Sequence, residues 1–197
     1  GNSLEVEQNG IEAQDGSYHN YISNVITEFI EHGIYFQSTE NCTLRYNRII
    51  DRPYEGEYKT GFNNDASSQN AYVANNYIEL RINDSYSTWS YGIRVHDSEI
   101  YNDTIRIDGG GNWRQYERGI YASRSTIRDN LIEIRDPSCN YVSYAIESYG
   151  DSDNRPLIKN NTIYATRCVS GIWASYADID SNLASNWTDD IRAYWGF

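Results

Sequence analysis

Few segments of this chain combine residue types that support metal or acid–base chemistry. Residues 151–154 read DSDN, and their oxygen ligands alternate as they do in calcium-binding loops. They fall short of the ligand number that such a site needs, so a solvated turn is favoured and bound calcium is the alternative. The three histidines, His19, His32 and His96, do not share a position in the repeat that organises the chain, and no two cysteines have the spacing of zinc ligands. We therefore expect neither a metal centre nor a cofactor.

A repeat of short segments runs through the chain and must position any functional side chain. Residues 158–163 read IKNNTI, and related segments include VANNYI at 73–78 and IRDNLI at 127–132. The second polar residue of these segments forms a column with spacings of 21 to 31 residues: Asn24, Asn47, Asn76, Asp103, Asn130, Asn161 and Asn182. A second column, in phase with the first, combines a small residue with an apolar one: Gly10-Ile11, Gly33-Ile34, Gly61-Phe62, Gly92-Ile93, Gly119-Ile120, Ala145-Ile146 and Gly171-Ile172. Two columns of seven members that keep their order indicate a repeat architecture.

Within each repeat the residues alternate with period two, which predicts short strands rather than helices. After Ile93, for example, Arg94 is expected to face outward and Val95 inward. Short strands in repeats of this length predict an all-β parallel solenoid, in which each strand stacks on its copy in the next repeat. Stacked positions lie about 4.8 Å apart, so the asparagine column is expected to form a hydrogen-bonded ladder. The outward residues Glu79, Arg106 and Glu133 of successive repeats alternate in charge, as stacked neighbours should.

These patterns define one domain over residues 1–197. Seven rungs are expected over about residues 10–184, followed by an aromatic C-terminal tail at 185–197. The residue before each ladder position, such as Asn160, is expected to face outward. The N-terminal residues leave no room for a cap, and the aromatic tail can either cover its own last rung or dock on a neighbouring chain. The uncapped N-terminal end favours end-to-end assembly, because unpaired strand edges are normally blunted in proteins that stay monomeric.

Composition and charge narrow the range of partners. The net charge is −12, from 28 acidic and 16 basic residues, and no run of lysine or arginine forms a patch for nucleic acid. No apolar stretch reaches membrane-spanning length and no signal peptide is present, so we expect no nucleic-acid partner and no membrane insertion. The chain starts at Gly1 and contains no methionine, which is consistent with a removed leader or a trimmed chain.

Several features favour an extracellular or cell-surface protein. The chain has 19 tyrosines and 5 tryptophans against 4 phenylalanines, which suggests aromatic rings on surfaces rather than in a core. Five sequons make glycosylation an expectation: Asn41, Asn83, Asn102, Asn160 and Asn186. Cys139 and Cys168 follow the second strands of adjacent repeats, where stacked positions have the Cα separation of a disulfide, so we predict that bridge. Cys42 is expected to be buried and free.

The long connections between the middle repeats carry aromatic residues that are candidates for ligand binding. They are Tyr54, Tyr58, Trp89, Trp113 and Tyr116. Rings presented in a row on one edge suit stacking on sugar faces, and they suit a protein partner equally well. They can also fold down and cover that edge of the solenoid. These three interpretations remain open.

The rung pattern, a Gly-Ile pair followed by I-x-N-N-x-I, resembles the single-stranded right-handed parallel β-helix of the pectate lyase-like superfamily, over about residues 10–184. That resemblance implies the fold more than the function, because the scaffold carries lyases, hydrolases, adhesins and assembly proteins. Polygalacturonase-like members use N-T-D, D-D, G-H-G and R-x-K motifs. Here Asn102, Asp103 and Thr104 stand in a different order on the ladder, Asp189-Asp190 lies past the last rung, and the other two motifs are absent.

Pectate lyase-like members place acidic calcium ligands beside a basic residue that removes a proton. By this resemblance, the nearest counterpart is Asp65 with Arg94 and His96, where His96 would deprotonate a uronic acid. An exposed histidine in a polar column is the favoured interpretation, so we expect a non-catalytic member. The leading hypothesis is an extracellular structural protein that assembles with itself into a surface layer, sheath or filament. The alternative is a carbohydrate-binding or polysaccharide-cleaving β-helix, and a phage or adhesin fibre is a third hypothesis.

Overall fold

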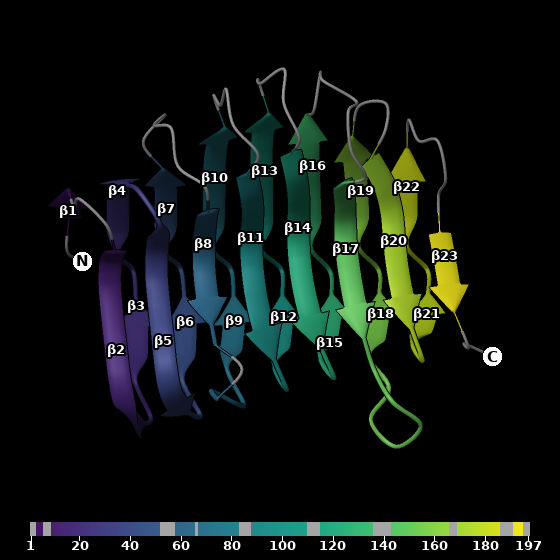
Figure 1. The fold of residues 1–197 in the computed structure, drawn as a ribbon, viewed down its shortest axis with the longest axis horizontal. Helices are drawn as coiled ribbons and strands as arrows, with labels where there is room; N and C mark the ends of the chain where they lie inside the picture. The colour runs from purple at the N-terminus through teal and green to yellow at the C-terminus, as the bar shows by residue number, and fades with distance from the viewer. Residues whose placement is uncertain are drawn as a thin grey trace.

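The computed structural model describes residues 3–5, 9–51, 58–65, 67–82, 88–109, 115–135, 143–165, 169–185 and 191–194. These residues form three parallel sheets and no helix (Figure 1). Sheet A consists, in spatial order, of β1 (Ser3–Glu5), β4 (Val25–Phe29), β7 (Arg48–Asp51), β10 (Tyr77–Ile82), β13 (Thr104–Gly109), β16 (Leu131–Arg135), β19 (Thr162–Ala165) and β22 (Leu183–Ser185). Sheet B consists of β2 (Asn9–Ser17), β5 (His32–Glu40), β8 (Tyr58–Asn64), β11 (Thr88–His96), β14 (Gln115–Ser123), β17 (Ser143–Tyr149), β20 (Val169–Ser175) and β23 (Ile191–Tyr194). Sheet C consists of β3 (Asn20–Ile22), β6 (Thr43–Arg45), β9 (Tyr72–Ala74), β12 (Glu99–Tyr101), β15 (Thr126–Arg128), β18 (Leu157–Lys159) and β21 (Asp178–Asp180).

The chain visits sheets B, C and A in turn, and each strand pairs in parallel with its copy in the next coil. Figure 1 shows sheet B as a continuous layer that runs the length of the molecule. The register follows the repeat: Ile78 lies beside Ile105, and Ile105 beside Ile132. The predicted fold class, an all-β parallel solenoid, is confirmed.

The solenoid extends beyond the expected limits of 10–184 at both ends. Sheets A and B have eight strands each, against the seven rungs expected, because β1 and β23 continue them. Part of the expected C-terminal tail is therefore a strand, which pairs with β20 so that Ile191 lies beside Ile172. The repeat pattern did not reveal β23 because Asp190 stands where the glycine column would place a small residue, and Ala184 replaces the ladder isoleucine.

Apolar side chains from all three sheets fill the interior in stacks. The following have no exposed surface: Ile49, Ile78, Ile105, Ile132 and Ile163 in sheet A; Ile34, Phe62, Ile93, Ile120, Ile146 and Ile172 in sheet B; and Leu44, Val73, Ile100, Ile127 and Ile158 in sheet C. Each such side chain contributes roughly 1.5–3 kcal/mol when it is fully buried. The stacks fix the register, since a slip of one residue would turn every one of them to the solvent.

The glycine column allows sheet B to approach sheet A closely. A Cβ atom on Gly92 would lie 2.4 Å from Ile105 Cγ2 and 2.6 Å from the carbonyl oxygen of Gly119. Gly33 and Gly61 meet the same two kinds of neighbour at 2.3–2.7 Å. The column is therefore set by contact between the sheets, and Ala145 is its one larger member among the described residues.

The ladder column lies at the turn between sheets C and A. In each described step that begins at an asparagine, its side-chain amide nitrogen donates to Oδ1 of the next ladder residue, as between Asn24 and Asn47 and between Asn161 and Asn182, both at 2.9 Å. Left-handed backbone occurs at the residue before the ladder position, with φ of 56° at Asn75 and 54° at Asn160. The ladder asparagine closes the turn, and the residue before it supplies the sharp bend.

Candidate functional site

Aromatic rings form a continuous row on the outer face of sheet B. Their positions follow from the alternation of each strand, which sends the neighbouring apolar side chains into the core. We call this row the aromatic belt; its members are Tyr58, Tyr91, Tyr121, Tyr149 and Trp173. Successive ring centroids lie 5.6, 5.5, 5.6 and 5.0 Å apart, at tilted or edge-to-face angles that favour aromatic pairs. The row crosses β8, β11, β14, β17 and β20, strands that follow one another along the long axis in Figure 1.

Arg94 lies within the belt. Its guanidinium carbon is 5.8 Å from the ring centroid of Tyr91 and 5.9 Å from that of Tyr121, within the range of cation–π attraction. Its Nη1 donates a hydrogen bond to Tyr58 Oη at 2.7 Å, whereas its buried Nε has no hydrogen-bond partner among the described residues. No acidic side chain in the described ranges lies within ion-pair distance of Arg94.

A second arginine beside the belt differs from the first in its pairing. Arg118 is only 7% exposed and forms an ion pair with Glu147 on the adjacent strand. Its guanidinium also lies 5.1 Å from the ring of Trp89 and 5.5 Å from that of Tyr144. The charge of Arg118 is therefore neutralised within the protein, whereas that of Arg94 is not.

Titratable neighbours leave Arg94 as the charged group at the centre of the belt. Burial lowers the pKa of His32 to about 4, assisted by the charge of Arg94, so this imidazole is neutral at pH 7. Burial, with a smaller effect of Arg94, also lowers the pKa of His96. Burial raises the pKa of Tyr91 to about 12, which keeps its hydroxyl protonated and able to donate. The belt therefore places phenol rings around Arg94; the hydroxyl of Tyr149 donates to Glu147, and Tyr91 is only 6% exposed.

Within the described residues, the three catalytic candidates form hydrogen bonds with other side chains rather than with one another. Oδ1 of Asp65 accepts hydrogen bonds from Ser67 Oγ at 2.7 Å and Ser68 Oγ at 2.9 Å, so this carboxylate closes a turn. Burial raises the pKa of Asp65, but these hydrogen bonds outweigh it and the net shift is downward. His96 Nδ1 lies 2.6 Å from Oγ of Ser123, its cross-strand neighbour. Its Nε2 has no partner among the described residues, so no carboxylate orients the ring as a triad would require.

The predicted ligand-binding aromatics are only partly described. Tyr54 and Trp113 lie outside the described residues. Tyr58, Trp89 and Tyr116 are neighbours on β8, β11 and β14. The rings of Trp89 and Tyr116 stack, with their centroids 4.5 Å apart and an interplanar angle of 13°. One face of each ring is therefore covered by the other ring, although Trp89 remains 43% exposed. The aromatic belt is a longer row than this pair. In the sequence it was visible as the column of outward residues that contains Arg94, Tyr121 and Trp173.

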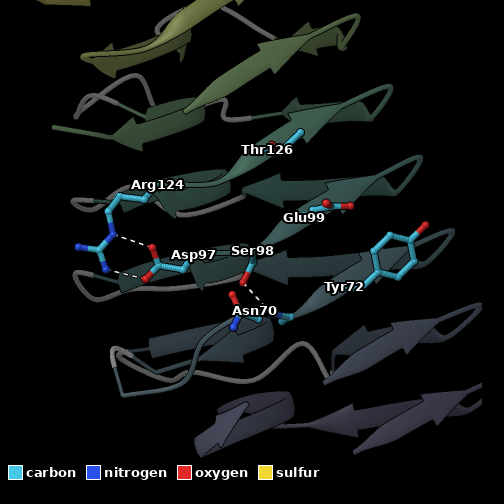
Figure 2. A pocket seen from close by; sticks show the side chains of 8 residues that line it. Asn70, Tyr72, Asp97, Ser98, Glu99, Arg124 and Thr126 are labelled. Atoms are coloured by element: carbon cyan, nitrogen blue, oxygen red, sulfur yellow. Dashed lines mark hydrogen bonds and ion pairs between the residues drawn. The ribbon is translucent and has the colours of Figure 1, made fainter. Parts of the chain in front are cut away.

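A shallow hollow of about 510 Å³ lies at the turns between sheets B and C. Figure 2 shows that Asp97 and Arg124 face one another across adjacent turns at one side of this hollow, with Tyr72 and Glu99 at the other. Two hydrogen bonds, at 2.6 and 2.5 Å, join the carboxylate to the guanidinium. Because these charges satisfy each other in an exposed place, the hollow is a weaker candidate for binding than the belt.

Three other predicted features can be placed. Asn41, Asn102 and Asn160 are exposed turn residues, whereas Asn83 and Asn186 lie outside the described residues, as do Cys139 and Cys168. Cys42 is buried and its Sγ lies 3.5 Å from the carbonyl oxygen of Glu40. In the calcium-like segment, Asp151 Oδ1 accepts the backbone N–H groups of Asp153 and Asn154 at 2.9 and 2.8 Å, which makes it a hydrogen-bonded turn. The described ranges contain no group of three or more His, Cys, Asp or Glu side chains suited to a metal ion.

Comparison with known proteins adds no relative. No family model, no curated protein and no solved structure matches the chain. In the part of the chain that the structure describes, no helix is long and apolar enough to cross a membrane. The geometry alone therefore defines the class, a parallel β-solenoid with an aromatic and arginine-bearing face.

Proposed function

We propose that the protein binds an extended polysaccharide along the outer face of sheet B, without cleaving it. The observation that carries this proposal is the aromatic belt around Arg94, whose charge has no acidic partner among the described residues. The five rings of the belt span four strand spacings, or about 20 Å, which is long enough for several linked sugars. A linear row of this kind matches a linear polymer better than the broad patch of a protein interface.

The chemistry of the belt suits sugars that carry an acidic group. Tyrosine and tryptophan rings offer apolar edges and faces to the C–H surface of a sugar, and phenol hydroxyls bond to its hydroxyls. Arg94 offers a charge-assisted hydrogen bond to a carboxylate or sulfate. Since the chain as a whole has a net charge of −12, this attraction is local to the belt and does not extend to polyanions in general.

A non-catalytic role is supported by the positions of the side chains that resembled a lyase site. Asp65 is used to close a turn, and His96 is paired with Ser123. Under this proposal the chain is a non-catalytic member of the right-handed pectate lyase-like group, which is supported by the repeat pattern. An extracellular location and glycosylation at Asn41, Asn102 and Asn160 are part of the same proposal, supported by the exposure of these residues.

We predict that Tyr121→Ala and Arg94→Gln weaken polysaccharide binding at least tenfold, because they remove the central ring and the unpaired cation. Affinity electrophoresis through gels that contain neutral or acidic polysaccharides measures this effect. Tyr164→Ala and Arg135→Gln, exposed on sheet A, serve as matched controls and should bind as the wild type does. Arg94→Gln should weaken binding to acidic polymers more than to neutral ones. Equal weakening by the sheet A controls, or no retardation by any polymer, would contradict the proposal.

End-to-end self-assembly into an extracellular layer, sheath or filament is the second candidate function. The observation that favours it is that β1, β2 and β3 at one end, and β22, β23 and β21 at the other, each pair on one side only within the described part of the chain. Such edges can continue their parallel pairing with an identical chain.

The assembly hypothesis predicts that the mass of the particle in solution rises with protein concentration. Size-exclusion chromatography with light scattering measures this mass, and electron microscopy shows whether the particles are linear. A chain that stays monomeric over the whole concentration range would rule out this second function. It would leave the proposal of polysaccharide binding untouched.

A further inference from the structure

The ladder has one irregular step, at Asp103. In a regular step, both the backbone nitrogen and the side-chain amide nitrogen of one residue donate to Oδ1 of the next. Asn76 donates in this way to Asp103 Oδ1, at 2.7 and 2.9 Å. In the step from Asp103 to Asn130 only the backbone bond is present, from Asp103 N to Asn130 Oδ1 at 2.8 Å. Asp103 Oδ2, which stands where the other members have an amide nitrogen, has no hydrogen-bond partner within the described residues.

The missing donor leaves oxygen atoms facing one another. The ladder amides also donate to a main-chain oxygen of the preceding coil, as Asn76 does to Leu44 at 3.0 Å and Asn130 does to Ile100 at 3.4 Å. By the same repeat, the counterpart oxygen for Asp103 belongs to Val73. An ionised Asp103 therefore places a charged oxygen among acceptors, in a residue that is 1% exposed.

Within the described ranges, no lysine, arginine or histidine forms an ion pair with this carboxyl group. Burial raises the pKa of Asp103 to about 7, opposed only by hydrogen bonds from Asn76 and from the backbone of Tyr101. The titratable and charged groups on the elements packed around it occupy outward positions: Glu79, Arg81 and Tyr77 on β10, Arg106 and Asp108 on β13, Glu99 and Tyr101 on β12, Arg128 on β15, Asp129 in the next turn, and Glu133 and Arg135 on β16. Most of these charges form ion pairs with one another, as Arg106 does with Glu133 at 2.7 Å.

We propose that Asp103 carries a proton in the folded protein and donates it from Oδ2 to Asn130 Oδ1, which gives the ladder one link that depends on pH. The protonated carboxyl group then reproduces the donor and the acceptor of an asparagine amide. Loss of the proton replaces that hydrogen bond by repulsion between two oxygens in the middle of the solenoid. The ladder step at Asp103 is therefore tightest in an acidic medium and weakens as the medium becomes alkaline.

The direction of the effect follows from proton linkage. The unfolded carboxyl group ionises at about pH 4 and the folded one at about pH 7, so the folded protein holds the extra proton between these values. The contribution of Asp103 to stability is complete below about pH 4 and is lost as pH rises through about 7.

Unfolding of the wild type and of Asp103→Asn, followed by melting temperature from pH 3 to pH 9, tests the proposal. Asparagine supplies the donor permanently, so Asp103→Asn should melt roughly 5–10 °C higher than the wild type at pH 8, with a difference that shrinks towards pH 4. Asp108→Asn, on the outward side of the same strand, is the control and should show no such trend. A difference that is independent of pH, or an Asp103→Asn variant that is less stable than the wild type at pH 8, would overturn the proposal.

A second measurement does not depend on the variant. Carbon-13 NMR of the Asp103 carboxyl group in the intact protein should give a titration midpoint well above the ordinary range for aspartate. A midpoint within or below that range would show that the group is ionised in the fold and would overturn the inference.

Discussion

Replacing Lys59 by methionine is expected to lower the free energy of unfolding by about 3–5 kcal/mol, the usual result of breaking a buried ion pair. Lys59 Nζ lies 3.2 Å from Asp51 Oδ2, and both side chains have 0% exposure. The pair closes the interior where β7 ends and β8 begins, and it is tied to the sheet because Arg81 N donates to Asp51 Oδ1 at 2.7 Å. Without the lysine, Asp51 is left as a buried charge or must take up a proton.

The pH dependence of this variant has a definite sign. Burial raises the pKa of Asp51 to about 6 even beside Lys59, and loss of the cation raises it further. The destabilisation of Lys59→Met should therefore be larger at pH 8 than at pH 4, where the folded carboxyl group is protonated in both the wild type and the variant. Urea unfolding at the two pH values measures it.

The matched control is the double variant Lys59→Met/Asp51→Leu. It removes both charges and should recover most of the loss, since apolar replacement of a buried pair is often close to neutral. A single variant within about 1 kcal/mol of the wild type at pH 8 would show that the pair is not fully desolvated.

Gly92→Val is expected to destabilise the protein by about 1–3 kcal/mol through overpacking. Its Cβ atom alone would lie 2.4 Å from Ile105 Cγ2 and 2.6 Å from the carbonyl oxygen of Gly119, and both neighbours are fixed in strands. Gly92→Ala should lose less, because Ala145 occupies the same column. Thr104→Val, an outward change on β13, is the control and should be nearly neutral. A Gly92→Val protein that unfolds at the urea concentration of the wild type would contradict this account of the glycine column.

The stacking of the solenoid was predictable because identical positions must meet when a chain coils. The asparagine column and the inward isoleucines kept the same order and phase in every repeat, so strand type, direction and register followed from them. β23 was missed because Asp190 precedes Ile191 where the other repeats have a small residue. The left-handed turn residue was not separated from the ladder residue, since both are asparagines in segments such as 158–163.

The candidate site depended on more than the repeat. The column with Arg94 and Tyr121 was visible as outward, but ring contacts between columns depend on side-chain rotamers that no repeat fixes. The buried pair of Lys59 and Asp51 was hidden for another reason. Connections of variable length separate these two residues from the columns. Counting residues from a column therefore did not predict whether their side chains face the interior or the solvent. The single aspartate in the ladder was visible in the sequence, and only the coordinates reveal that its second oxygen lacks a donor.

The most direct test of polysaccharide binding is a residue-resolved NMR titration of the side-chain rings. The ligand is an oligosaccharide fragment of the polymer that retards the protein most strongly in affinity electrophoresis. The account predicts that the ring signals of Tyr91, Tyr121 and Trp173 on sheet B shift with the added fragment, whereas that of Tyr164 on sheet A stays in place. Shifts confined to sheet A or to the hollow beside Tyr72, or no shift at saturating fragment, would contradict it.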